Sequence, residues 1–193
     1  MVFQDPFASL NPYMRLQEQI AEPLKNFGLG SKSERNDLVA DILKKVELPL
    51  SFLSRFPHEL SGGQRQRVAI ARAIVVNPSL VITDEAVSAL DVSVQAQVLN
   101  LMMSLQDELG LSYLFISHDM AVVERVSHKV GVMYLGRLAE LGTRAQIFEN
   151  PQHDYTRSLM AAVPIADPKQ RNIFIFMSFK PIPSPVFPVG HRV

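Results

Sequence analysis

The stretch Leu80-Val81-Ile82-Thr83-Asp84-Glu85 decides the fold, because a short apolar run ends there in two adjacent carboxylates. The run is rich in β-branched residues and shows no alternation, which predicts a strand buried on both faces of a parallel sheet. Tyr113-Leu114-Phe115-Ile116 repeats this pattern shortly before His118. Ligands of open α/β sheets bind beyond the carboxyl ends of the strands. We therefore expect Asp84, Glu85 and His118 to be neighbours at one edge of the sheet.

Predicted helices alternate with these strands. Ser31 and Glu34 have the spacing of a capping box, and the helix after them ends before Pro49. Apolar residues at helical spacing predict further helices over residues 16–24, 62–76, 94–109, 120–125, 143–148 and 155–162. Residues 1–4 have the pattern of a strand end, and residues 129–134 that of a strand. The resulting β-α-β-α-β order implies an α/β fold with a parallel sheet and right-handed crossovers.

The composition fits one ordinary α/β domain or a large piece of a bigger one. The 193 residues are 47% hydrophobic, and 19 basic residues balance 19 acidic ones. This balance lacks the basic footprint of a nucleic-acid binder, and without cysteine there is no disulfide or thiolate metal site. Residues 1–10 do not have a signal-peptide pattern, and no stretch is apolar enough to span a membrane. We therefore expect a soluble, intracellular chain with no nucleic acid as partner.

Adjacent carboxylates after a buried strand can divide catalytic work. Asp84 can hold Mg²⁺, usually through water, while Glu85 can orient or deprotonate an attacking water. The alternative is a helix N-terminus, where the macrodipole favours acidic residues. His118 could contact a γ-phosphate or that water, or it could be an ordinary residue at a helix start. Gln4 follows a strand end, where its amide could bind Mg²⁺ or water, although alone it resembles any loop residue.

Ser61-Gly62-Gly63-Gln64 opens a helix in a way that suits a phosphate group. Ser61 can cap the helix, and the two glycines allow a ligand to approach N–H groups that attract phosphate. The alternative is a cap without a ligand. Two glycines inside a helix cost about 1 kcal/mol each relative to alanine, and a plain cap does not need them.

In their order along the chain, these motifs resemble those of the ABC-type ATPases. The matches are the Q-loop (Gln4), the signature (Ser61-Gly62-Gly63-Gln64), the Walker B motif (Asp84-Glu85), the D-loop (Ser88-Ala89-Leu90-Asp91) and the switch histidine (His118). The resemblance covers about residues 1–164 and implies a P-loop NTPase-like parallel sheet with a helical subdomain. It divides the chain into a Q-loop region (1–12), a helical subdomain (13–60), a core part with the remaining motifs (61–150) and a C-terminal extension with a Pro-rich tail (151–193).

Finer details are similar to the oligopeptide/dipeptide importer branch of that family. They are Phe3-Gln4-Asp5-Pro6, Val92-Ser93-Val94-Gln95-Ala96-Gln97, Met133-Tyr134-Leu135-Gly136, the set Pro151, His153, Tyr155 and Thr156, and Ile182-Pro183-Ser184-Pro185. This similarity implies an ATP-binding subunit that couples ATP hydrolysis to solute import, with peptides as the solute class.

The resemblance also implies roles, cofactors and partners. With ATP and Mg²⁺ as cofactors, Asp84 supports the metal, Glu85 is the general base and His118 contacts the γ-phosphate. Gln4 joins the metal to the region that senses the membrane subunits, on which the helical subdomain docks. The signature faces the ATP of a second ATP-binding subunit, and the D-loop lies at that dimer interface. The implied location is the cytoplasmic face of the inner membrane, as a peripheral subunit.

The family's P-loop motif is not found in this sequence. No Gly-x-x-x-x-Gly-Lys-Ser/Thr occurs, and Gly28-Leu29-Gly30-Ser31-Lys32-Ser33 is interpreted as a turn and helix cap. Because the P-loop cradles the β- and γ-phosphates, we expect the chain alone to lack ATPase activity and to expose a sheet edge and apolar surface. Position 86 is alanine, where the family usually has proline, and we expect a modest effect.

Three hypotheses follow. The first is the C-terminal part of an importer ATPase subunit. The second is a non-catalytic fragment that at most pairs with a complete ABC ATPase. The third, an ABC ATPase of DNA repair or translation, is disfavoured because the sequence has neither a long coiled-coil heptad pattern nor a basic patch.

Overall fold

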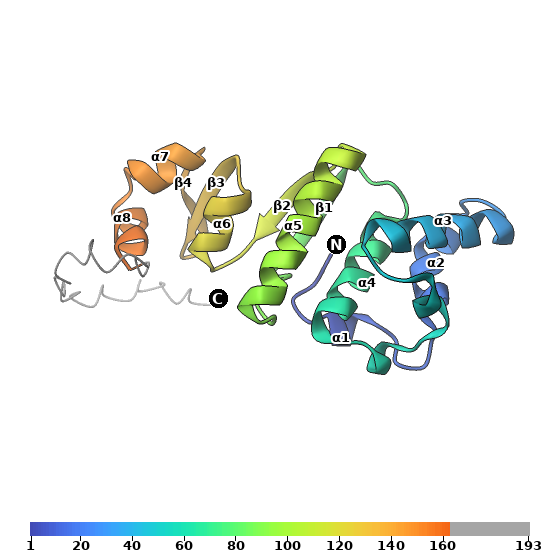
Figure 1. Cartoon of the computed structure of the whole chain (residues 1–193). Helices are drawn as coiled ribbons and strands as arrows, with labels where there is room; N and C mark the ends of the chain where they lie inside the picture. Colours follow the sequence, from blue (N-terminus) through green and yellow to red (C-terminus); the bar gives the residue numbers. More distant parts are fainter. Residues whose placement is uncertain (163–193) are drawn as a thin grey trace, which may run out of the picture. The chain divides into compact units, whose positions relative to one another are not determined.

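Two parallel strands form the centre of the fold, as predicted (Figure 1). In the computed structural model, which describes residues 1–162, β1 (Leu80–Asp84) pairs with β2 (Ser112–Ile116). On the other edge of β1, Val2 forms a single parallel bridge with Thr83. The start of the chain is therefore extended, as expected. The prediction of a Pro-rich, semi-extended tail concerns residues outside the described ones.

Helices occupy the segments where apolar residues recur at helical spacing. They are α1 (Pro6–Ser9), α2 (Leu16–Asn26), α3 (Lys32–Lys45), α4 (Gly62–Ile74), α5 (Val92–Leu109), α6 (Met120–Val126), α7 (Arg144–Glu149) and α8 (Asp154–Ala161), with 3-10 turns η1 (Leu50–Ser54) and η2 (Pro57–Glu59). The predicted capping box before α3 is confirmed, since Ser31 N donates to Glu34 Oε2 at 2.6 Å and Glu34 N to Ser31 Oγ at 3.3 Å. Helix α1 was not predicted; Asp5 caps it by accepting from Phe7 N.

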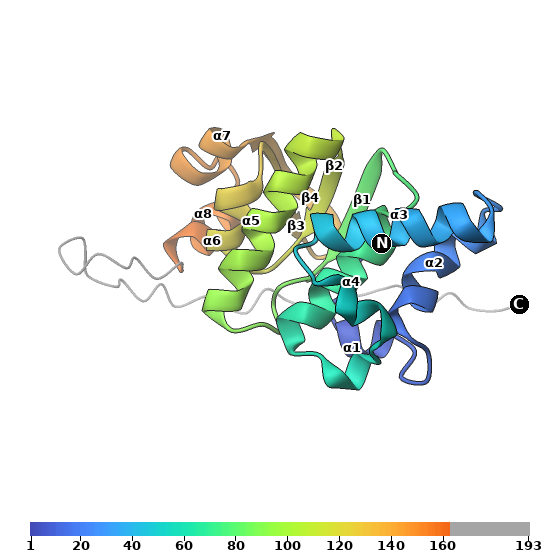
Figure 2. The same ribbon diagram turned by 45° about the vertical axis from the view of Figure 1, so that its right-hand side comes forward.

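Helices α2, α3 and α4 lie side by side in both views (Figure 2). Their shared interior contains side chains with no exposed surface: Leu16, Val39, Leu43 and Val68. Arg72 of α4 joins this group to the start of the chain, because its guanidinium donates to Ser9 O and pairs with Glu22 of α2. The domain boundaries drawn from the sequence stay a prediction.

Helix α5 covers one face of the β1–β2 pair, and this corrects the prediction of strands buried on both faces. Val81 and Thr83, which alternate onto the same face of β1, are buried. On the opposite face, Leu114 is 52% exposed and Ile116 is 45% exposed. The apolar runs of β1 and β2 therefore give the pair a second apolar face, and no element among residues 1–162 covers that face. Exposed apolar surface of this kind was expected.

The strand at residues 129–134 is not part of the parallel sheet, and here the prediction was wrong. β3 (Lys129–Tyr134) pairs antiparallel with β4 (Arg137–Thr143), a strand that was not predicted. Leu135 and Gly136 join them with φ angles of 48° and 75°. Two left-handed residues in a two-residue loop define the tight turn that favours antiparallel hairpins. The turn therefore directs the chain straight back along β3.

Glu140 of β4 holds the start of α8. Its carboxylate accepts hydrogen bonds from Gln152 N at 2.8 Å and from His153 N at 3.1 Å. The pKa of Glu140 is lowered by the Thr156 hydroxyl and by these two N–H groups. The Thr156 hydroxyl lies near the carboxylate without forming a well-aligned hydrogen bond. Tyr134 and Tyr155 stack beside this contact, with ring centroids 4.1 Å apart. None of the described helices is long and apolar enough to cross a membrane.

Candidate functional site

Three predicted residues from three separate segments meet at the Glu85 carboxylate. Gln4 Nε2 donates to Glu85 Oε2 at 2.7 Å, and His118 Nδ1 lies 3.0 Å from Glu85 Oε1. Each carboxylate oxygen therefore has one side-chain partner. The expectation that Glu85 and His118 are neighbours at one sheet edge is confirmed, and Gln4 joins them there.

Backbone hydrogen bonds place Gln4 at this position. Val2 N donates to Ile82 O at 2.8 Å, and Asp84 N donates to Val2 O at 2.9 Å. These two bonds fix the register of the first residues against β1. Because side chains alternate along an extended segment, the register also fixes which of them reaches Glu85.

The backbone of Glu85 is unusual and firmly held. Its φ angle is 47°, in the left-handed region that residues with a Cβ seldom adopt. Glu85 N donates to Ile116 O at 2.9 Å, while Glu85 O accepts from Ser88 N at 3.1 Å and Ser88 Oγ at 2.9 Å. The alternative of a helix N-terminus at Asp84-Glu85 is wrong, because the next helix begins only at Val92.

His118 lies directly before the cap of α6. Asp119 caps that helix by accepting from Ala121 N at 3.0 Å and Val122 N at 3.3 Å. The His118 side chain is 70% exposed, whereas that of Glu85 is 29% exposed. The imidazole therefore reaches Glu85 from the solvent side. His118 therefore lies at a helix start, as one alternative held, and it also contacts Glu85, as the other held.

This arrangement suits activation of a water molecule. The Gln4 amide N–H group can only donate, so the Glu85 oxygen beside it accepts. A carboxylate has about four lone-pair sites, and two remain after Gln4 and His118 are served. A free site on a positioned carboxylate can accept a proton from an attacking water.

Asp84 and Gln4 offer oxygen atoms of the kind that Mg²⁺ binds. Both residues line a hollow of about 840 Å³ that also includes Phe3 and Arg72. The Asp84 carboxylate makes no hydrogen bond to another described residue, and Gln4 keeps its amide oxygen free when Nε2 faces Glu85. Mg²⁺ is commonly held by one or two carboxylates together with phosphate and water, so these donors fit it. Within residues 1–162 no cluster of three or more acidic, His or Cys side chains could hold a metal by itself.

The signature residues form the predicted cap of α4. Ser61 N donates to Gln64 Oε1 at 3.0 Å, and Gln64 N donates to Ser61 Oγ at 3.4 Å. The two polar side chains thus satisfy each other's backbone at the exposed start of the helix. No hydrogen bond between described residues joins them to Glu85.

The two signature glycines face the protein itself. A Cβ at Gly63 would lie 2.3 Å from Val94 Cγ1, and a Cβ at Gly62 would lie 3.6 Å from Leu90 Cδ2. Close packing against α5 is therefore a reason for Gly63 that the sequence reasoning missed. The sequence signal for this packing is a bulky residue, Val94, near the start of α5.

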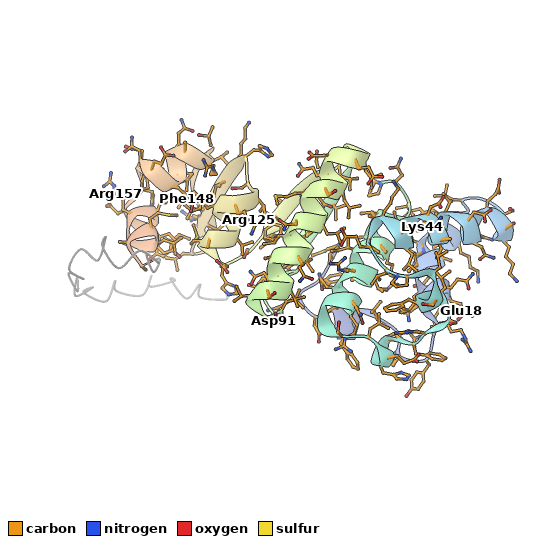
Figure 3. All side chains as sticks on the ribbon, viewed as in Figure 1. Glu18, Lys44, Asp91, Arg125, Phe148 and Arg157 are labelled. Carbon is orange, nitrogen blue, oxygen red and sulfur yellow. The ribbon has the colours of Figure 1, made fainter. Side chains whose placement is uncertain are left out.

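The D-loop residues connect Glu85 with α5. Ser88 holds the Glu85 carbonyl, Leu90 packs on the side where a Cβ of Gly62 would point, and Asp91 caps α5 by accepting from Val94 N at 3.0 Å. Ala89 lies between them. Figure 3 shows Asp91 at the end of α5 where that helix begins. The clamp made by Ser88 was not predicted, because a serine in a loop carries no sequence signal for it.

Comparison with known proteins identifies the class. Residues 1–88 match the family model "ABC transporter", and residues 139–181 match "Oligopeptide/dipeptide transporter, C-terminal region". The dimeric ATP-binding cassette MJ0796 bound to ADP and Pi is 31% identical, with a TM-score of 0.63 over 74% of this chain and 61% of its own. The cbiO1 protein of Clostridium perfringens is 29% identical, with a TM-score of 0.69 over 77% of this chain and 58% of its own. The chain belongs to the ABC-type ATPases.

Two relatives narrow the branch. The glutathione import ATP-binding protein GsiA of Pectobacterium atrosepticum is 54% identical over 98% of this chain and 30% of its own length. The probable peptide ABC transporter ATP-binding protein y4tS of Sinorhizobium fredii is 53% identical over 97% of this chain and 53% of its own length. The chain thus corresponds to a segment of the ATP-binding proteins of the oligopeptide/dipeptide branch, and spans about a third to a half of these relatives.

Proposed function

We propose that this chain supplies the water-activating side of an ATP-hydrolysing site in a peptide-class ABC importer. The observation that carries the proposal is the Glu85 carboxylate, held between Gln4 and His118 at the end of β1. Glu85 is the general base in this proposal. His118 contacts the γ-phosphate, and Asp84 with Gln4 supports Mg²⁺, which neutralises charge on the phosphates when bound.

The signature residues serve the ATP of a second ATP-binding subunit in this proposal. Their N–H groups at the start of α4 form a helix N-terminus that favours phosphate. Residues Ser88 to Asp91 lie at the interface with that subunit in this proposal. Leu90 supports this, because its Cδ2 would lie 3.6 Å from a Cβ placed at the signature residue Gly62. The names of the dimeric cassettes among the similar structures support such pairing.

The names of the relatives support the solute class and location that we propose. Their names describe glutathione and peptide import, and we propose small peptides as the transported class here. The helical subdomain, residues 13–60, then docks on the membrane subunits, which places the chain at the cytoplasmic face of the inner membrane. An ATPase of DNA repair or translation has no supporting observation among the described residues.

A chimaera tests the catalytic role. This chain replaces the aligned segment of the y4tS protein, and Mg²⁺-dependent ATP hydrolysis is measured for the parent chimaera and for Glu85→Gln. A positioned general base contributes about 10²–10⁴-fold, so kcat should fall at least about 100-fold while ATP binding persists. The matched control is Glu18→Gln, an exposed change of the same kind in α2.

Two outcomes decide between the proposal and its alternative. A chimaera that hydrolyses ATP equally well with Glu85→Gln removes the general-base role, and one that binds ATP without hydrolysis favours a non-catalytic segment. The 193-residue chain alone should hydrolyse ATP only at background, because its sequence holds no P-loop motif. Clear turnover by that chain, abolished by Glu85→Gln, would contradict this expectation.

A further inference from the structure

The start of α4 packs against the start of α5 without room for a side chain. A Cβ placed at Gly63 would lie 2.3 Å from Cγ1 of Val94 and 3.7 Å from its Cβ. Real Cβ atoms do not approach other heavy atoms to 2.3 Å, so either α4 or Val94 would have to move. Valine has one strongly preferred rotamer in a helix, which leaves Val94 little freedom to yield.

The neighbouring glycine does not share this constraint. A Cβ at Gly62 would meet only Leu90 Cδ2, at 3.6 Å, which is an ordinary van der Waals contact. A need for backbone approach to a ligand would apply to both glycines. The contact with Val94 applies to Gly63 alone.

Three local hydrogen bonds hold the chain between Glu85 and Val94. Ser88 N donates to Glu85 O at 3.1 Å, Leu90 N to Val87 O at 3.2 Å, and Val94 N to Asp91 Oδ1 at 3.0 Å. Val87 is only 2% exposed, so the core also holds this segment. Val94 and the turn that carries Glu85 therefore belong to one locally hydrogen-bonded segment of the chain.

We propose that Val94 is a positioning residue that sets the signature helix against the turn of Glu85. Through its contact with Gly63, it fixes how closely the start of α4 approaches residues 85–91. The signature residues and the turn of Glu85 thus keep a constant distance from each other within one chain. The effect of this contact on catalysis rests on the proposed function. The contact between Gly63 and Val94 does not depend on that function.

Melting temperatures of four variants of the full chain test the contact. Gly63→Ala should melt about 5 °C lower, because overpacking costs a few kcal/mol in a chain of this size. Gly62→Ala, the matched control, should melt at the parent temperature or slightly higher, since alanine favours a helix. In a Val94→Ala background, Gly63→Ala should cost less than about 2 °C, because only the more distant Cβ then remains. Equal costs in both backgrounds, or equal effects at the two glycines, overturn the proposal.

Hydrogen exchange separates positioning from general loss of stability. Gly63→Ala should raise the exchange rates of the Ser88, Leu90 and Val94 amides at least about tenfold beyond the global change. Val39→Ala, a core change in α3, should raise them no more than it raises other amides. If Gly63→Ala leaves these three amides at the global rate, Val94 does not position the turn.

The chimaera then connects the contact with catalysis. Gly63→Ala should lower kcat for ATP, and Val94→Ala should restore part of that loss. If Gly63→Ala lowers kcat and Val94→Ala does not restore it, while the melting and exchange experiments give the expected results, only the link between the contact and catalysis is contradicted. An inactive parent chimaera contradicts the proposed function, and the melting and exchange results still decide on Val94.

Discussion

Replacing Tyr113 with phenylalanine should stabilise the protein, although it removes a polar group from a strand of the central sheet. Tyr113 lies opposite Val81 in the β1–β2 pair and packs against the main core. Its hydroxyl is enclosed, and it has no hydrogen-bond partner among the described residues. An enclosed hydroxyl without a partner has lost its water and gained nothing in return.

The expected gain is of the order of 1 kcal/mol. An unsatisfied buried polar group costs about 1–3 kcal/mol, and we expect the lower end because Tyr113 as a whole is half-buried although its hydroxyl is enclosed. For a chain of this size that corresponds to a rise in melting temperature of about 2–4 °C. Tyr113→Phe conserves the ring, so packing should change little.

The stability of the parent chain should also depend on alkaline pH through this residue. Burial raises the pKa of Tyr113 to about 12, from an ordinary value of 10.0. The folded state therefore keeps the proton while the unfolded state loses it. Ionisation of Tyr113 therefore leaves stability unchanged below pH 10 and lowers it as the pH rises from 10 toward 12, because only the unfolded state gains from losing the proton there.

Urea unfolding of both chains at pH 7 and pH 11 measures these effects. The phenylalanine variant should be more stable at pH 7, and its advantage should grow at pH 11. The other tyrosines, Tyr13, Tyr134 and Tyr155, are the same in both chains and cancel in the comparison. A less stable variant at pH 7 would show that the hydroxyl has a partner, and a constant difference between the two pH values would refute the raised pKa.

Two other changes test contacts described above. Ser31→Ala removes the side chain that caps α3 and should cost about 1 kcal/mol, seen as an earlier urea midpoint with an unchanged m-value. Ser33→Ala, in the first turn of the same helix, is the control and should have little effect. Glu140→Gln should destabilise α8 at pH 7, since a carboxylate with a lowered pKa contributes above its unfolded pKa and loses that contribution as the pH falls through the folded one. Exchange rates of the Gln152 and His153 amides report on this, and an equal difference between parent and variant at pH 7 and pH 3 would contradict it.

The sequence predicts most elements because their signals are local. The capping box of Ser31 and Glu34 and the spacing of apolar residues place the helices within a few residues. The proximity of Glu85 and His118 is also predictable, because parallel strands bring their carboxyl ends to one edge. Each of these inferences needs only periodicity or topology.

The missed features depend on contacts between distant segments. The β3–β4 hairpin depends on a left-handed conformation at Leu135, and a leucine in the sequence does not predict that conformation. The close approach of Gly63 to Val94 depends on how two helices meet, and a pair of glycines alone suggested a ligand instead. The exposed face of Leu114 and Ile116 shows that an apolar run without alternation does not ensure burial on both faces of a strand.

The left-handed backbone of Glu85 sets two selection pressures against each other at one position. Glycine or asparagine would accept a φ of 47° more easily, whereas glutamate gives up about 1–2 kcal/mol there. Neither replacement carries a carboxylate, so the residues that relax the turn are the ones that cannot activate water. Under the proposed function, stability and activity therefore compete at a single residue, and the hydrogen bonds from Ser88 help to hold the glutamate in this conformation.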